Sequence, residues 1–175
     1  MNELDEYRTG KDAFFRDDPR SPLTAEQRAG FTGLAYYPED ERLRIEAALD
    51  LDVDRTEDVV MATSTGDAQT YHRAGTVTFE VDGEPAEITL YGSEDTEELF
   101  VPFRDATSGN ETYGAGRYLE VEPPDRDGRV MLDFNMAYNP NCCYNEFWSC
   151  PLPPRENWLT VPIRAGEKDF PGAHA

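Results

Sequence analysis

Four polar side chains lie close together in a stretch that ends in two adjacent cysteines. The stretch reads VMLDFNMAYNPNCC, and its polar side chains are Asp133, Asn135, Tyr138 and Asn139. On a strand, Asp133 and Asn135 share one face because successive side chains alternate. In a closed barrel that face could point into the lumen, where small barrels hold ligands; in an open sheet it faces solvent. We expect the four residues to supply hydrogen bonds to a polar ligand.

A second segment supplies positive charge and further hydroxyl groups. In FRDATSGNETYGAGRY, Arg104 and Arg117 flank Thr107 and Tyr113. The planar guanidinium presents a fork of donors that suits carboxylate or phosphate. We therefore expect these residues to bind an anionic group of a small molecule. The alternative is that the arginines form internal salt bridges with Asp105, Asp133 or Glu120.

Acid and base groups for a reaction are available in the same segments. Asp133 or Glu156 could act as general base, and Tyr138 or Tyr113 as general acid, with hydrolysis as the simplest reaction. Acid–base catalysis needs shifted pKa values in a cleft, and a sequence shows neither. Whether the protein is an enzyme therefore stays open.

The proline- and aromatic-rich segment 138–158 supports a different function. It contains Phe147, Trp148 and Trp158, and exposed aromatic side chains of this kind mark protein interfaces. The alternative to small-molecule binding is thus a non-catalytic interaction or structural module that uses this segment. The two hypotheses differ in whether Phe147 and Trp158 are buried beside a polar pocket or exposed as an apolar patch.

Three cysteines fall within nine positions, at Cys142, Cys143 and Cys150. Three thiols are one short of a zinc site made of cysteine alone, and His72 and His174 lie outside any ligand spacing. The sequence therefore predicts neither a metal nor a cofactor. A disulfide from either neighbouring cysteine to Cys150 would close a small loop, whereas a reducing cytoplasm would leave buried free thiols. The residues alone leave both open.

The charge balance excludes some partners. The chain has 36 acidic and 16 basic residues, a net charge of −20, and only two lysines, Lys11 and Lys168. Such a charge repels nucleic acid and anionic lipid. The acid excess also predicts adaptation to high salt, where counterions screen the repulsion. Without a basic-then-apolar leader or an apolar run of roughly 18 residues, we expect a cytoplasmic protein; its oligomeric state is not predicted.

The elements that position these groups can be read from periodicity. The first 31 residues predict short helices packed on a sheet: an amphipathic one before Pro19, and one that begins with a capping box at Thr24 and Gln27 and ends near Gly30. Alternating apolar residues favour a strand over a helix at 43–49. Further strands are predicted at 58–63, 75–81, 86–91, 99–103, 116–121 and 130–136.

These elements predict one domain, residues 1–175, that is mainly β, or α+β by content. Short strands at regular spacing, without strand–helix–strand alternation, favour an antiparallel barrel or sandwich. Residues 132–170 form a segment rich in cysteine, proline and aromatic residues. Proline donates no ladder hydrogen bond, so its part after Cys150 should be irregular backbone or an edge strand.

Three long stretches carry a family resemblance: KDAFFRDDPRSPLTAEQRAGFTGLAYYP, PFRDATSGNETYGAGRYLEVE and LDFNMAYNPNCCYNEFWSCPLPPRENWLTVPIRAGEKDF. Together they resemble the domain of unknown function 1684, found in bacteria and archaea, here in an unusually acidic version. The resemblance implies no activity. It draws attention to the residues in its motifs: Arg104, Asp105, Thr107, Thr112, Tyr113, Gly116, Arg117, Tyr118, Asp133, Asn135, Tyr138, Asn139, Pro140, Cys142, Cys150, Pro151, Glu156, Asn157 and Glu167. Since Cys143 stands where the family would have a small residue, the resemblance implies that a disulfide would join Cys142 to Cys150.

Overall fold

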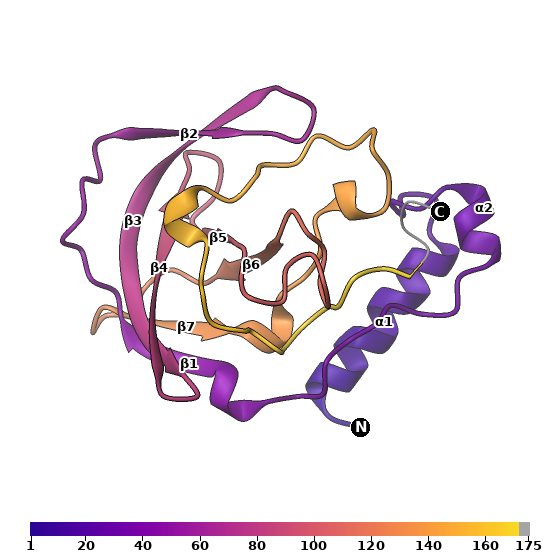
Figure 1. The fold of residues 1–175 in the computed structure, drawn as a ribbon, viewed down its shortest axis with the longest axis horizontal. Helices are drawn as coiled ribbons and strands as arrows, with labels where there is room; N and C mark the ends of the chain where they lie inside the picture. The colour runs from indigo at the N-terminus through magenta and orange to yellow at the C-terminus, as the bar shows by residue number, and fades with distance from the viewer. Residues whose placement is uncertain (172–175) are drawn as a thin grey trace.

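The structure, a computed structural model, describes residues 1–171. His174, considered above as a metal ligand, lies outside the described residues. The chain opens with two helices, α1 (Glu3–Asp17) and α2 (Ala25–Ala29). They lie side by side at one end of the molecule, far from β3 (Figure 1). The prediction of short N-terminal helices is confirmed.

Both helices begin where side chains satisfy the free backbone donors of the first turn. Asn2 accepts a hydrogen bond from the backbone N–H of Asp5, and the Asp5 carboxylate accepts one from the N–H of Asn2. Thr24 and Gln27 form the same reciprocal pair at the start of α2, as their spacing predicts. Such capping boxes make short helices possible where little apolar surface is buried.

Within the described residues 1–171, seven strands form two antiparallel sheets. The five-stranded sheet has the order β2-β3-β4-β5-β6, and the two-stranded sheet pairs β1 with β7. The strands are β1 (Arg44–Ala48), β2 (Asp58–Ala62), β3 (Ala68–Val81), β4 (Glu84–Gly92), β5 (Leu99–Phe103), β6 (Arg117–Val121) and β7 (Arg129–Asp133). Of the 3-10 helices within residues 1–171, η1 (Glu41–Leu43) comes directly before β1, and three follow β7: η2 (Phe134–Met136), η3 (Asn141–Cys143) and η4 (Arg155–Asn157).

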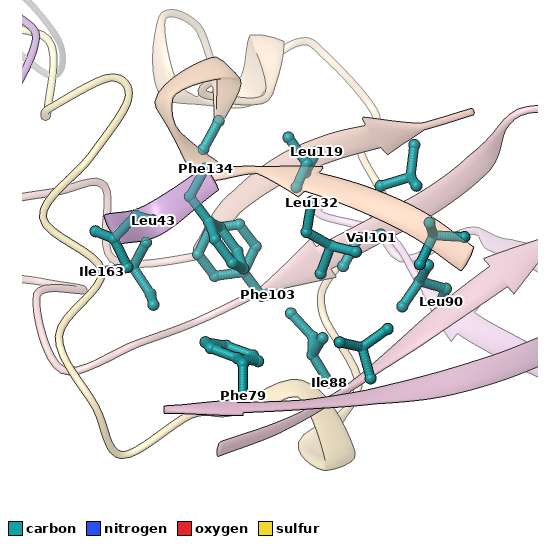
Figure 2. Packing of buried hydrophobic residues seen from close by; sticks show 14 of the residues in the cluster. Leu43, Phe79, Ile88, Leu90, Val101, Phe103, Leu119, Leu132, Phe134 and Ile163 are labelled. Carbon is teal, nitrogen blue, oxygen red and sulfur yellow. The ribbon is translucent and has the colours of Figure 1, made fainter. Parts of the chain in front are cut away.

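The two sheets face each other as in a sandwich, with an apolar core between them. Leu132 of β7 and Phe134, which follows β7, point towards Phe79 of β3 and Ile88 of β4 from the opposite side of the core (Figure 2). The antiparallel sandwich is therefore confirmed. In the part of the chain that the structure describes, the strands do not close into a barrel. The ligand lumen expected for a barrel is not formed, because apolar side chains fill this space.

All seven predicted strands are present, and two of them, β3 and β7, differ from the prediction by more than two residues at one end. β3 begins at Ala68 and not at residue 75. The prediction missed the first half of this strand, AQTYHR, because it lacks the apolar alternation by which strands are recognised. β7 ends at Asp133, since the Asp133 carboxylate accepts a hydrogen bond from the N–H of Asn135 and starts η2. Asn135 is therefore not on the strand face that its spacing predicted.

The segment after Cys150 is mostly irregular, as its prolines predict. It starts beside the end of β2, where Thr63 forms a bridge with Pro151, and crosses the strands towards α1 (Figure 1). Its apolar residues Val161 and Ile163 are buried in the core between the sheets. Since a segment without ladder hydrogen bonds needs other partners for its backbone, buried polar side chains must supply them.

No helix within residues 1–171 combines the length and apolar character that crossing a membrane requires.

Candidate functional site

Arg117, expected to bind an anion, is fully buried. Its guanidinium donates hydrogen bonds to the backbone carbonyls of Ile163 at 2.8 Å and Glu167 at 3.2 Å, and to that of Ala165. The carboxylate of Asp105 lies 3.5 Å away. Burial lowers the pKa of Arg117, an effect that the charge of Asp105 opposes. Arg117 therefore anchors the C-terminal segment to β6, and the internal alternative describes it better than a ligand contact.

The loop that contains Thr107 is also tied to the C-terminal segment. Thr107 donates to the Asp105 carboxylate and lies 3.0 Å from the hydroxyl of Thr112. Asp105 Oδ2 also accepts the backbone N–H of Ile163 at 2.6 Å. The side chains of Asp105, Thr107 and Thr112 are all buried. They form hydrogen bonds with one another and with the backbone, so none of them is exposed to a ligand.

Arg104 is packed against an aromatic ring. Its guanidinium lies 4.5 Å from the centroid of the Trp158 ring, and that of Arg155 lies 5.2 Å from the same ring. A cation over an indole face gains electrostatic attraction. Trp158 is 44 % exposed, so this stack lies at the surface.

Asp133 and Asn135 hold the turn that precedes β1. The Asn135 side chain donates to the carbonyl of Asp40 at 3.0 Å and accepts its N–H at 2.9 Å. Asp133 accepts from Arg44 at 3.1 Å and from the Asn135 amide at 2.9 Å. Asp133 also lines a shallow hollow of about 510 Å³ beside the start of α1. Asn135 is buried and both of its amide atoms have protein partners.

Asn139 is part of a buried polar network beneath α1. Its backbone N–H donates to the Glu167 carboxylate at 3.1 Å, and its side-chain amide donates to the carbonyl of Lys168. The Tyr144 hydroxyl donates to the same carboxylate, and Lys11 of α1 forms an ion pair with it. Glu167 is 2 % exposed. This network fixes α1 to the C-terminal segment.

Three of the four residues considered for acid–base catalysis, Asp133, Tyr138 and Glu156, are not brought together. Glu156 accepts hydrogen bonds from Arg73 at 3.1 Å and from the hydroxyl of Tyr91. Asp133 is paired near β1, and Tyr138 lines a different hollow on the five-stranded sheet. A general base and a general acid must reach the same substrate, so these residues do not form one catalytic set.

Tyr138 lies in a groove with three other aromatic rings. A hollow of about 340 Å³ is lined by Tyr71 of β3, Phe100 of β5, Tyr118 of β6 and Tyr138. We call this surface the aromatic groove. It is the hollow that combines a residue of the sequence motifs with a continuous aromatic wall.

The strand pattern explains how these rings meet. Leu99, Val101 and Phe103 point into the core, so Phe100, between Leu99 and Val101, points to the outer face of the sheet. β4 ends at Gly92, which pairs with His72 of β3. Tyr71 therefore lies beyond the end of β4, and its ring stacks on Phe100 with centroids 5.4 Å apart.

The row of rings continues to β6, the edge strand of the sheet, and from there to Tyr138 beside it. Phe100 meets Tyr118 edge to face with centroids 4.8 Å apart, and Tyr118 meets Tyr138 in the same manner at 5.8 Å. Backbone hydrogen bonds between Tyr118 and Tyr138 hold the last pair in register. The aromatic groove is thus built on strands and on a bridged residue and not on a free loop.

Carboxylates surround the aromatic groove. Glu98 and Glu120 line it, and the Tyr138 hydroxyl donates a hydrogen bond to Glu120. Burial, followed by the bond to Glu120, raises the pKa of Tyr138 above its ordinary value. Burial also raises the pKa of Tyr71, helped by the charge of Asp95. The phenols therefore stay neutral at physiological pH beside negative charge.

The cysteines lie behind the aromatic groove as free thiols. Cys142 and Cys150 pack with Tyr118, and the backbone N–H of Cys142 lies 3.3 Å from the sulfur of Cys150. Cys143 belongs to a separate cluster with Phe15.

Known proteins resemble this chain over most of its length. The family model described as "Protein of unknown function (DUF1684)" matches residues 29–168. The chain belongs to this family. A solved structure of an uncharacterised protein from Haloarcula marismortui is 39% identical, covers 95% of this chain and 92% of its own, and gives a TM-score of 0.71. None of the curated proteins matches the chain.

The range matched by DUF1684 includes every residue of the aromatic groove but not α1, which ends at Asp17. Sequence reasoning found Tyr138 and placed Tyr118 in a motif, but did not single out Tyr71 or Phe100. For Phe100 the sequence signal is strand alternation, because the outward face of LFVPF does not pack into the core and an aromatic residue there is unexpected.

Proposed function

We propose that this protein binds a small organic cation, such as an ammonium compound, in the aromatic groove. The observation that carries the proposal is the row of four aromatic rings with Glu98 and Glu120 at the same hollow. The faces of aromatic rings attract cations, most strongly where water is excluded, and nearby carboxylates add charge attraction.

Charge on the whole chain favours the same ligand class. A net charge of −20 raises the local concentration of cations and repels anions. An anionic ligand, expected from Arg104 and Arg117, has weaker support because these arginines contact Trp158 and backbone carbonyls. Hydrolysis also has weaker support, since Asp133 and Glu156 have partners away from the aromatic groove.

A non-catalytic protein-interaction module is the second candidate function. Phe147 is 66 % exposed and Trp158 is 44 % exposed, and exposure of these two residues is the outcome that favours this second candidate. The ring of Phe147 lies 5.3 Å from that of Trp148. Large exposed aromatic side chains are typical of interfaces. Loss of a partner on changing Phe147, with cation binding intact, would assign these residues a separate role.

Cytoplasmic location and adaptation to high salt are part of the proposal. Three free buried cysteines suit a reducing compartment. The acid excess suits a solvent whose counterions screen surface repulsion.

The test is a calorimetric titration of the wild-type protein and matched variants with choline, an organic cation. Tyr71→Leu removes one ring while keeping apolar bulk, and should weaken binding by about 0.5–2 kcal/mol. Tyr7→Leu is the matched control, because Tyr7 is exposed on α1 outside the aromatic groove. Equal affinity in the two variants would contradict the proposed site.

A charge variant tests the carboxylates separately. Glu120→Gln should weaken choline binding, whereas Glu87→Gln, at an exposed position of β4, should leave it unchanged. Equal weakening by both variants would assign the charge effect to the whole surface and not to this hollow.

A further inference from the structure

Two cysteines of the chain pack in one apolar cluster, and the proposed function does not use them. They are Cys142 and Cys150. The backbone N–H of Cys142 donates to the Cys150 sulfur at 3.3 Å. The third thiol, Cys143, is 3.6 Å from the carboxylate of Asp169 and packs in a different cluster.

Hydroxyl groups surround the pair. The Tyr113 hydroxyl lies 3.6 Å from the Cys142 sulfur. The Ser64 hydroxyl accepts the backbone N–H of Cys150 and donates to the carbonyl of Trp148, which holds the end of the intervening loop. The sequence brings these groups together from three distant segments, so their arrangement depends on the complete fold.

The surroundings favour ionisation of one thiol of the pair. The hydrogen bond from Cys150 lowers the pKa of Cys142 to about 6, against the opposing effect of burial, and the hydroxyls of Tyr113 and Ser64 lower it further. The pKa of Cys150 is raised, because it shares its proton with Cys142. Burial raises the pKa of Cys143. Thiolates are the nucleophilic form of cysteine, so Cys142 is the reactive member.

The burial of Cys142 and Cys150 limits which oxidants can reach their sulfur atoms. Cys142 is 4 % exposed and Cys150 is 7 % exposed, so a bulky disulfide reagent does not reach them without displacing the loop. A chain with a net charge of −20 also repels anionic disulfides. A small uncharged peroxide meets neither obstacle.

We propose that Cys142 and Cys150 form a dithiol that hydrogen peroxide oxidises to a disulfide. The Cys142 thiolate attacks one peroxide oxygen, the O–O bond breaks, and hydroxide leaves as Cys142 becomes a sulfenic acid. The Cys150 sulfur then attacks the Cys142 sulfur, its proton is released, and the second hydroxide leaves. With protons from both thiols, each hydroxide becomes water. In the balance, two thiols and one peroxide give one disulfide and two waters.

The test exposes the reduced protein to hydrogen peroxide and counts free thiols by mass spectrometry after denaturation without reductant. Wild type should fall from three free thiols to one, and Cys143→Ser from two to none, with dithiothreitol reversing both changes. In Cys150→Ser, dimedone should label a sulfenic acid at Cys142. In Cys142→Ser, rapid oxidation should be lost.

A second variant guards against misfolding of the cysteine variants. Tyr113→Phe keeps both thiols but removes the hydroxyl near Cys142, and should slow oxidation several-fold. Three free thiols in wild type, after exposure that fully oxidises free cysteine in the same solution, would overturn the proposal. Oxidation of Cys142→Ser at the wild-type rate would overturn it as well.

Discussion

The buried polar residues of the sequence motifs serve the backbone of irregular segments. Asn157 shows this clearly, since its side chain bonds Thr89 in both directions and the carbonyl of Pro102. Arg117 acts likewise on the C-terminal segment. Uncharged polar residues in an acidic chain drew attention to these segments, but a sequence does not show which hydrogen-bonding groups face solvent and which face backbone. Only the fold separates Tyr138 in its open hollow from the buried Asn135.

Asn135→Ala tests this separation. The change leaves the part-buried N–H and carbonyl of Asp40 without their partner, and should reduce the free energy of unfolding by about 1–3 kcal/mol. Choline affinity should stay unchanged. Urea unfolding and calorimetry measure the two quantities, with Asn141→Ala at an exposed position as the control. Weaker binding with unchanged stability would restore the sequence-based expectation that Asn135 contacts a ligand.

The pH dependence of thiol reactivity tests the Cys142 environment. In Cys143→Ser, the rate of alkylation by iodoacetamide should rise through pH about 6, because the thiolate reacts and the pKa of Cys142 lies there. Cys150, Tyr113 and Tyr118 are the titratable groups that face this thiol. They stay protonated in this range, since their pKa values are raised. A midpoint near pH 8.5, the ordinary value for cysteine, would contradict the assignment.

At the scale of elements, strands were predictable where one face is apolar and the other polar. β1 alternates in this way and forms as predicted, whereas the polar first half of β3 gives no such signal. Which strands pair with one another could not be predicted, because the paired strands lie far apart in the sequence. β1 pairs with β7, about 85 residues away, and nothing local in either strand specifies that pairing.

Polar contacts attach α1 together with a small amount of apolar packing, and one of them is an ion pair with a buried carboxylate. Only Leu4 and Phe15 of α1 are buried, while Lys11 pairs with the buried Glu167. Lys11→Met should therefore lower the free energy of unfolding by on the order of 3 kcal/mol, because a buried carboxylate loses its partner. Thermal or urea unfolding measures this loss.

Lys168→Met is the matched control for α1, since Lys168 contacts the ring of Tyr37 and is partly exposed. It should have a smaller effect, below about 1 kcal/mol. Equal losses in the two variants would show that the Lys11 ion pair has no special role.

At the scale of the whole molecule, the acid excess should make stability depend on salt. The Debye length falls from about 10 Å at 0.1 M to about 3 Å at 1 M, so molar KCl screens repulsion among surface carboxylates. The melting temperature should rise markedly between these concentrations. A flat or falling curve would contradict adaptation to high salt.

The central claim is that the aromatic groove recognises positive charge and not merely apolar bulk. The most direct measurement compares, by calorimetry in one buffer, the affinities of choline and its uncharged carbon analogue 3,3-dimethylbutan-1-ol. The proposed cation–π contacts predict that choline binds more tightly, by about 0.5–2 kcal/mol, and that Tyr71→Leu reduces the difference. Equal affinities, or tighter binding of the uncharged analogue, would contradict the account.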